Sequence, residues 1–508
     1  MRQEFPFVLF IAAFAAYTLL LFVVSWLTTR GKAGSFFSGD RKAPWPVVAY
    51  GMIGASVTGV TFISVPGNVW VQNFFYMPMV LGFVVGYVII AQVLLPLYYR
   101  KNLTSIYSYL GERFGQNSYL TGTTAFMISR LLGAAVRIYV VAVVFMTFIP
   151  RGFVEAISPS GTFMLISTVF LALVYLYTYK GGVRTIIWTD VLQTTFMLLA
   201  VVLGIIHICK DMGWGFSSMV SAVGGTINAN EAGVGFGQTF TSWFDWNWSH
   251  GTNAVKQFIS GIVVTIAMTG LDQSMMQKNL ACKDIKASQK NMYTTSAIIV
   301  VVNLFFLLLG ALLCAYTYDK GGFDALGISR TDEMFPAIAS GYLGIGIGVF
   351  FLIGLVSASY PSAGNAMTSL TTSVCVDFLG IDRREGLDAA GKERLRKRVQ
   401  AIVAAVFLLI MTVLYLVSND AVINLVYKLA SYTYGPLLGL FFFGILSERR
   451  IHDKAAPAVA VAAPVLCLIF NMLSKKLWGF DLGFSLLLVN GVLTFLGMWL
   501  ISIRESRS

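Results

Sequence analysis

One apolar stretch in the second half of the chain is unusually rich in side-chain oxygens. It reads GLVSASYPSAGNAMTSLTTSVCVD (354–377), with serines, threonines and one asparagine spread along its length. Hydroxyl and carbonyl oxygens are the ligands that a hard, weakly held cation such as Na⁺ prefers. No acidic cage accompanies them, as expected for a cation that must bind and leave. The alternative is that these hydroxyls bond back to carbonyls of their own helix.

A few ionisable residues lie inside other apolar stretches. Asp190 sits in TIIWTDVLQ (185–193), Lys428 lies near several tyrosines, and Arg130 and Arg137 are seven residues apart. That spacing places both arginines on one face of a helix. A charge at the centre of a bilayer costs roughly 2.5–3.5 kcal/mol, so such residues usually bind something or pair with each other. Asp190 is expected to hold an ion or an ion-pair partner, and the cations are open to either role.

The composition identifies the solvent around these residues. Of 508 residues, 57% are hydrophobic and 12% are charged, whereas soluble domains carry about 25% charged residues. The five cysteines and three histidines are scattered without a C-x-x-C pair, so neither disulfides nor a metal cluster is expected. No nucleophile–base pair is evident either. The chain is predicted to be a membrane protein and not an enzyme.

Thirteen stretches are long and apolar enough to be membrane-spanning helices, each of which needs about 20 such residues. They lie at 7–28, 45–72, 77–99, 118–149, 160–178, 185–209, 254–276, 291–317, 343–375, 399–418, 421–446, 455–473 and 482–503. The connections are short and leave no room for a soluble catalytic domain. The predicted fold is therefore all-α and polytopic.

The basic residues are distributed unevenly between the loops. If odd-numbered spans run inward, 25 of the 36 lysines and arginines fall on the cytoplasmic side and seven on the other. Cytoplasmic loops carry such an excess. This predicts a multi-pass protein of the cell (inner) membrane with its N-terminus outside and its C-terminus in the cytoplasm. The net charge of +12 thus reflects topology rather than binding of nucleic acid.

Two of the spans are interrupted. The second, 45–72, contains Gly54, Gly59 and Pro66, and the seventh, 254–276, contains Gly270 followed by Asp272. Unsatisfied backbone groups cannot face lipid, so such breaks line protein or a water-filled cavity. Spans two and seven are five apart, which places them at corresponding positions of an inverted repeat. Paired broken helices of this kind indicate the substrate site of a transporter.

Five segments carry a resemblance to a known family. They are TGVTFISVPGNVW (58–70), YKGGVRTIIWTDVLQ (179–193), LDQSMMQKNLACKDIKASQ (271–289), LTTSVCVD (370–377) and SYTYGPLLGLF (431–441). Together they resemble the sodium:solute symporter family, which includes sodium-coupled carriers of sugars, sialic acid, proline, pantothenate and iodide. The resemblance implies one transporter domain, 1–508, with the inverted five-plus-five helix core shared with the bacterial leucine transporter. An extra N-terminal helix (1–44) would precede the core (45–446), and two helices (447–508) would follow it.

The resemblance also implies a sodium site between spans two and nine. Its ligands would be the carbonyls of Gly54, Val57 and Ala358 and the hydroxyl of Ser362. Pro361 occupies the position of a second serine ligand, which leaves open a weaker site, a shifted ligand or another cation. Family members with a second sodium use the aspartate that matches Asp190 together with serines. Those serines correspond here to Pro361, Gly364 and Asn365, so Asp190 is expected to pair with Arg137 or Arg130 instead.

The resemblance places the solute at the break in span two. Thr58 and Thr61 match positions that line the pocket, with Tyr76 nearby, and Arg137 and Lys428 are the candidate charged contacts. The arginine that binds carboxylate in sialic acid carriers falls near Gly133. The expected function is sodium-coupled symport of a small polar solute into the cell by alternating access. A sugar or sugar acid is favoured, and an amino or organic acid stays open. The alternatives are a proton-coupled or uncoupled carrier of the same fold, and a transporter-like sensor. The expected partners are the solute, Na⁺ and the lipid bilayer.

Overall fold

A computed structural model describes residues 6–29, 43–101, 103, 105–179, 182–225, 242–381, 388–417, 422–480 and 482–503. Within them the chain is helical apart from a two-stranded antiparallel ribbon, β1 (Arg450–Ile451) with β2 (Ser502–Ile503). This ribbon joins the ends of the last two long helices. Ten helices are long and apolar enough to cross a membrane, and two further helix pairs would each do so as one bent span.

The elements follow one another with short connections. The first half contains α1 (Phe7–Thr29), α2 (Trp45–Ser56), α3 (Gly59–Gln72), α4 (Met77–Ile89), the π-helical turn η2 (Ile90–Leu94), α5 (Leu95–Lys101), α6 (Ser108–Arg113), α7 (Gln116–Met146), α8 (Arg151–Ile157), α9 (Pro159–Thr178), α10 (Gly182–Asp211) and α11 (Phe216–Gly225). The second half contains α12 (Ala254–Thr265), the π-helical turn η3 (Ile266–Gly270), α13 (Gln273–Leu280), α14 (Ile285–Asp319), α15 (Gly322–Leu326), the 3₁₀ turn η4 (Thr331–Glu333), α16 (Met334–Gly341), α17 (Ile345–Ser373), the π-helical turn η5 (Val374–Phe378), α18 (Ala389–Val417), α19 (Val422–Thr433), α20 (Gly435–Leu446), the 3₁₀ turn η6 (Asp453–Ala455), α21 (Ala456–Trp478), the 3₁₀ turn η7 (Gly483–Ser485) and α22 (Leu486–Leu500).

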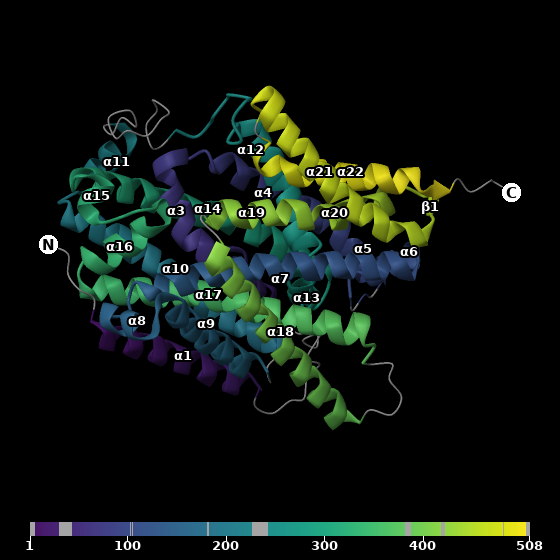
Figure 1. The fold of residues 1–508 in the computed structure, drawn as a ribbon, viewed down its shortest axis with the longest axis horizontal. Coiled ribbons are helices and arrows are strands. Elements are labelled where there is room, and N and C mark those ends of the chain that lie inside the picture. Colours follow the sequence, from purple (N-terminus) through teal and green to yellow (C-terminus); the bar gives the residue numbers. More distant parts are fainter. Residues whose placement is uncertain are drawn as a thin grey trace.

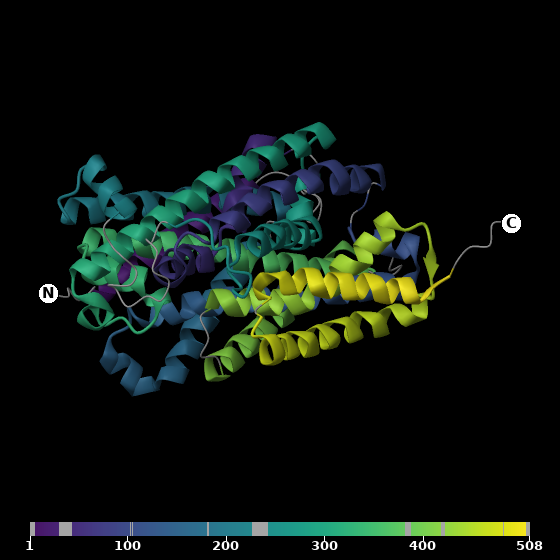
Figure 2. The same ribbon diagram turned by 90° about the horizontal axis from the view of Figure 1, so that it is seen from above.

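Most of the long helices run along the long axis of the molecule, as two perpendicular views show (Figures 1 and 2). The helices α7 and α17 are the most buried of the candidate spans, whereas α1, α18 and α21 are the least buried. The core therefore lies around α7 and α17, against which α10, α2 and α3 pack. The peripheral helices expose apolar side chains, as lipid-facing helices do. Thus the centre of the bundle can hold polar groups away from lipid.

Two helix breaks interrupt spans at this centre. The helices α2 and α3 meet at an angle of 59°, and the α12–η3 helix meets α13 at 69°. Between α2 and α3, Val57 and Thr58 adopt extended backbone conformations, which suit their branched side chains. At the second break, Asp272 is extended and caps α13. Both breaks lie in the spans whose glycine pattern predicted them.

The predicted spans correspond one by one to the observed helices. The stretch 421–446, expected as a single span, is divided at Tyr434 into α19 and α20. Pro436 lies at the start of α20, where a proline is tolerated because the first helical N–H groups have no partner. This third break was not predicted, although the Gly435–Pro436 pair was its signal.

Candidate functional site

A cavity of about 850 Å³ lies at the break between α2 and α3. It is lined mostly by hydroxyl, amide and guanidinium groups together with apolar side chains. The lining residues are Ala55, Ser56, Val57, Thr58, Val60, Thr61, Tyr76, Phe83, Tyr87, Arg130, Arg137, Val264, Thr265, Met268, Thr269, Met275, Ile299 and Asn303. They come from α2, α3, α4, α7, α12, η3, α13 and α14 and from the connections between them, so both halves of the chain contribute. Polar groups that converge in a largely preformed cavity are the usual features of a small-molecule site.

The start of α3 is fixed by its own side chains. The Thr58 backbone N–H donates to the Thr61 hydroxyl (3.4 Å), and Thr58 occupies the N-cap position of α3. This reciprocal cap holds Thr58 and Thr61 at the cavity wall. Gly59 lies so close to α7 and α17 that an added Cβ would stand 2.9 Å from Val141 Cγ2 and 3.2 Å from Ser359 Oγ. The break therefore depends on a residue without a side chain at position 59.

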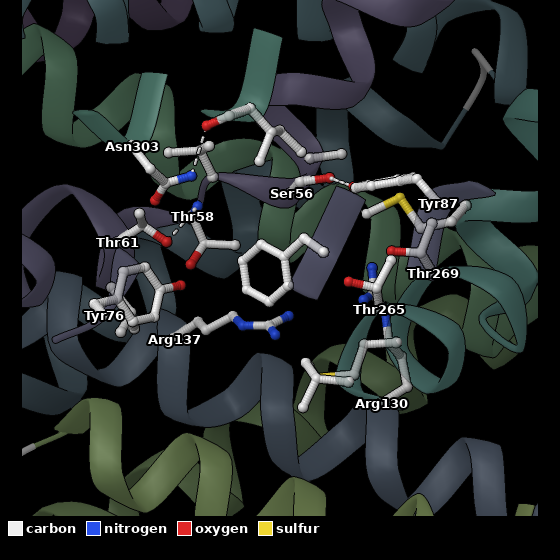
Figure 3. Close-up of a pocket in the computed structure, with 18 residues that line it drawn as sticks. Ser56, Thr58, Thr61, Tyr76, Tyr87, Arg130, Arg137, Thr265, Thr269 and Asn303 are labelled. Atoms are coloured by element: carbon white, nitrogen blue, oxygen red, sulfur yellow. Dashed lines mark hydrogen bonds between the residues drawn. The ribbon is translucent and has the colours of Figure 1, made fainter. Parts of the chain in front are cut away.

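The two arginines of α7 face the cavity from the same side, as their spacing predicted. In Figure 3 the Arg137 side chain extends into the cavity near Thr58 and Tyr76, with its guanidinium directed towards Thr265 and Arg130. Arg130 is buried and forms an ion pair with Asp272 (3.2 Å) and a hydrogen bond to the Ser274 hydroxyl (3.1 Å). Among the 18 described residues that line the cavity, none is acidic. With Arg130 compensated by Asp272, the cavity carries the positive charge of Arg137.

Asp272 explains how the second broken span is held. One of its carboxylate oxygens accepts hydrogen bonds from the backbone N–H groups of Ser274 (2.9 Å) and Met275 (3.1 Å), and the other faces Arg130. A carboxylate at the N-cap satisfies free N–H groups and interacts favourably with the helix dipole. The ion pair thus ties the start of α13 to the middle of α7 beside the cavity.

The oxygens expected to hold sodium lie at the other side of the same break. The Val57 N–H donates to the Ile53 carbonyl as the last bond of α2 (2.7 Å). The carbonyls from Gly54 onwards therefore follow the last hydrogen-bonded turn, and helix ends leave such oxygens available. On α17, the buried Ser362 hydroxyl has no hydrogen-bond partner within the protein. An added Cβ on Gly59 would stand 4.0 Å from the Ala358 carbonyl oxygen, so this part of α17 borders the break. These neutral oxygens suit a hard monovalent cation.

Asp190 does not pair with Arg130 or Arg137, and that expectation was wrong. Its carboxylate forms a buried ion pair with the ammonium of Lys278. Lys278 was counted among the cytoplasmic loop residues, but it lies buried in α13. The break at Asp272 turns α13 by 69°, and α13 then packs against α10 and α17. The lysine is therefore a core residue of the bundle, which its sequence position near several other lysines did not reveal.

Lys428 is not brought to the cavity. Its side chain is exposed on α19, about two turns from the start of that helix, and it is absent from the described cavity lining. A long lysine side chain near a helix end can extend its ammonium to the membrane surface. Conversely, the cavity includes Tyr87, Thr265, Thr269 and Asn303, which the sequence had not singled out. Their only signal was a polar residue within an apolar span.

Comparison with known proteins decides the family. Residues 36–457 match the model of the sodium:solute symporter family. The chain belongs to this family. It is 24% identical to the sodium/sialic acid symporter of Aliivibrio fischeri, over 91% of this chain and 87% of that protein. It is also 24% identical to the sodium/sialic acid symporter of Proteus mirabilis, over 95% of this chain and 92% of that protein.

A solved structure shows the same architecture. A substrate-bound, outward-open Na⁺-coupled sialic acid symporter has a TM-score of 0.78 and 19% sequence identity, and the match covers 97% of both chains. The expected fold class, an inverted-repeat transporter core like that of the leucine transporter, is confirmed. The symporter is a multi-pass membrane protein that couples solute transport to sodium, and its family consists of transporters rather than enzymes.

Proposed function

We propose that this symporter imports a small anionic solute, a sugar acid or another organic carboxylate, together with sodium. The observation that carries the proposal is the charge of the central cavity. Arg137 lines it, Arg130 is already neutralised by Asp272 at 3.2 Å, and none of the described lining residues is acidic. A guanidinium recognises a carboxylate through two parallel hydrogen bonds. The relatives named as sialic acid symporters carry a solute of this chemical class.

Arg137 offers its charge at a different level of α7 from the arginine expected in sialic acid carriers. That arginine corresponds to the region of Gly133, one helical turn before Arg137 and on the same face. At Gly133 an added Cβ would meet no atom within 4 Å. The position is therefore open space, and the solute can reach past it to the guanidinium. We expect the carboxylate to sit one turn along α7, or about 5.4 Å, from its place in those carriers.

The hydroxyls around the cavity would hold the rest of the solute. Thr58, Thr61 and Tyr76 lie on the wall opposite α12, and Thr265 and Thr269 lie on α12 and η3. Hydroxyls both donate and accept hydrogen bonds, so they suit the hydroxyl groups of a sugar acid. Phe83, Val264 and Met268 supply apolar contacts. Such a mixed lining favours a polyhydroxy acid over a purely apolar one.

Sodium and solute would be coupled through the break itself. Gly54 and Val57 offer carbonyls to the ion from the end of α2, and Ala358 and Ser362 offer theirs from α17. Thr58, the next residue along, lines the solute cavity. An ion that joins α2 to α17 fixes the cavity wall, so each ligand binds better when the other is present. Such coupling is reciprocal and is typically worth about 1–3 kcal/mol.

The direction of transport follows from the proposed orientation in the membrane. The excess of lysines and arginines in alternate loops predicts an outer N-terminus and a cytoplasmic C-terminus in the cell membrane. The first residues of α1 and the last residues of α22 lie at opposite ends of the molecule (Figure 1), which fits an odd number of spans. Sodium would then enter from outside and leave into the low-sodium cytoplasm with the solute.

A ligand screen on the purified protein tests the proposal. N-acetylneuraminic acid, glucuronate and lactate would be compared with glucose and N-acetylmannosamine as uncharged controls, in NaCl and in KCl. We expect at least one acid to raise the melting temperature in NaCl only, and its uncharged counterpart to leave it unchanged. Uncharged sugars that stabilise the protein and are taken up as well as the acids would refute the anionic substrate.

A further inference from the structure

We infer that the Lys278 ammonium is the permanent counter-ion of Asp190 and that this symporter moves one sodium ion, not two, with each solute. The inference rests on the sodium site proposed above at α2 and α17. It concerns a different place, the contact of α10, α13 and α17, where some family members are expected to hold a second sodium. The residues present here do not fit that ion.

The carboxylate of Asp190 is already fully engaged by groups of the protein. It is 1% exposed and receives the ammonium of Lys278, which is 3% exposed. The Asn365 side chain hydrogen-bonds the same carboxylate. A sodium ion would have to displace this ammonium, and a buried lysine without its partner is strongly unfavourable. The lysine cannot leave for water, because α13 is enclosed by α2, α10, α14 and α17.

The other ligands of a second site are also missing. Pro361 replaces a serine and carries no side-chain oxygen. At Gly364 the space of an added Cβ is filled by the Tyr177 hydroxyl, which itself donates to the Tyr360 carbonyl (3.3 Å). A serine at 364 would therefore collide with a buried tyrosine. The hydroxyls expected at two positions are thus replaced by a proline ring and by the phenol of a neighbouring helix.

The first site differs in the one respect that matters. The Ser362 hydroxyl is buried and has no partner within the protein, and the carbonyls at the end of α2 follow its last hydrogen-bonded turn. Buried polar groups are rarely left without a partner. Oxygens at the first site thus await a cation, whereas at the second position the carboxylate already has one. This contrast predicts that a single sodium binds.

The consequence is a change in the charge moved per cycle. One sodium ion and one monovalent carboxylate carry no net charge together, whereas two sodium ions would carry one positive charge. Since Lys278 is covalently attached, its charge stays with the protein through the cycle. Transport of a monocarboxylate would therefore be electroneutral and insensitive to membrane potential.

Binding of sodium alone tests the inference without knowledge of the solute. Equilibrium binding of radioactive ²²Na⁺ to the purified full-length protein should saturate at one ion per chain. The double variant Asp190→Asn/Lys278→Met removes both charges with side chains of similar size, and so avoids leaving either charge buried alone. It should still bind one ion, with a dissociation constant within about threefold of the original.

The control variant Ser362→Ala should weaken binding of that single ion while leaving the Asp190–Lys278 pair intact. Two ions per chain in the unaltered protein, falling to one in the double variant, would overturn the inference by showing that Asp190 holds sodium. No bound sodium in the unaltered protein would overturn it as well, together with the site at α2 and α17. Neither result depends on the solute, so a failure of the anionic substrate would be seen separately in the ligand screen.

Discussion

Replacing the two arginines of α7 separately should have opposite consequences. Arg137 lines the solute cavity, whereas Arg130 is 5% exposed and pairs with the fully buried Asp272. We therefore expect Arg137→Gln to weaken solute binding and Arg130→Gln to weaken the fold. The two positions are seven residues apart on one helix face, so each variant is a matched control for the other.

The magnitudes follow from the contacts. A hydrogen bond to a charged group contributes about 1.5–3 kcal/mol, and 1.4 kcal/mol corresponds to about tenfold in affinity. Arg137→Gln should thus raise the dissociation constant of the carboxylate by roughly ten- to a hundredfold. Arg130→Gln leaves the Asp272 carboxylate without its counter-ion, and breaking a buried pair costs about 3–5 kcal/mol. The backbone N–H groups that Asp272 accepts from at 2.9 and 3.1 Å place the expected loss at the lower end.

Two measurements on the same preparations distinguish the roles. The dissociation constant of the acid found in the ligand screen would be measured in saturating NaCl, and the melting temperature would be measured without solute. Arg137→Gln should also abolish the preference for the acid over its amide, while keeping the melting temperature. The reasoning is refuted if Arg137→Gln binds the acid as tightly as the unaltered protein, or if Arg130→Gln melts at the same temperature.

Three further changes follow from the same geometry. Ser362→Ala should raise the sodium dissociation constant by about tenfold, since one of few ligands is lost, while Ser359→Ala, whose hydroxyl already bonds the Leu355 carbonyl, should change it little; equal effects would argue against the site. Gly59→Val should abolish uptake with the protein still folded, because its side chain would force α3 away from α7 and α17, and normal uptake would contradict the close approach at 2.9 Å. In the loop before α12, partial burial opposes but hydrogen bonds from Thr252, the Asn247 N–H and His250 outweigh it, so that the pKa of Asp245 is lowered; its contribution to stability should be present above about pH 4, the ordinary aspartate value, and be lost as the pH falls through the lowered pKa. Melting temperatures of Asp245→Asn and the unaltered protein should therefore differ at pH 6 and converge in acid, and a constant difference would contradict this.

The breaks were predictable because their causes are local. Glycines in an apolar stretch weaken a helix wherever they occur, so both bent spans could be located from sequence before any contact was known. The shared face of Arg130 and Arg137 followed equally from helical spacing. The break at Tyr434 was missed because its glycine and proline lie in a stretch that is otherwise long enough for one span.

The ion pairs could not be predicted because they depend on distant contacts. Asp190 and Lys278 are 88 residues apart, and Lys278 follows Asp272 in a stretch that also resembles the start of a polar loop. Only the 69° turn at Asp272 brings α13 into the bundle. Lys428 illustrates the opposite case, since a lysine within an apolar span was expected to serve the site but is exposed on α19. Burial of a charge is decided by the packing of helices, which the order of residues in one helix does not specify.

Uptake into proteoliposomes tests the central claim, sodium-driven transport of an anion, most directly. Vesicles containing the protein would receive an inward sodium gradient, and the radiolabelled acid from the ligand screen would be followed with the membrane potential clamped. The account predicts accumulation above equilibrium that requires the sodium gradient, is abolished in Arg137→Gln and is unchanged by a potential of either sign. Accumulation without a sodium gradient, or equal accumulation by the Arg137→Gln variant, would contradict it.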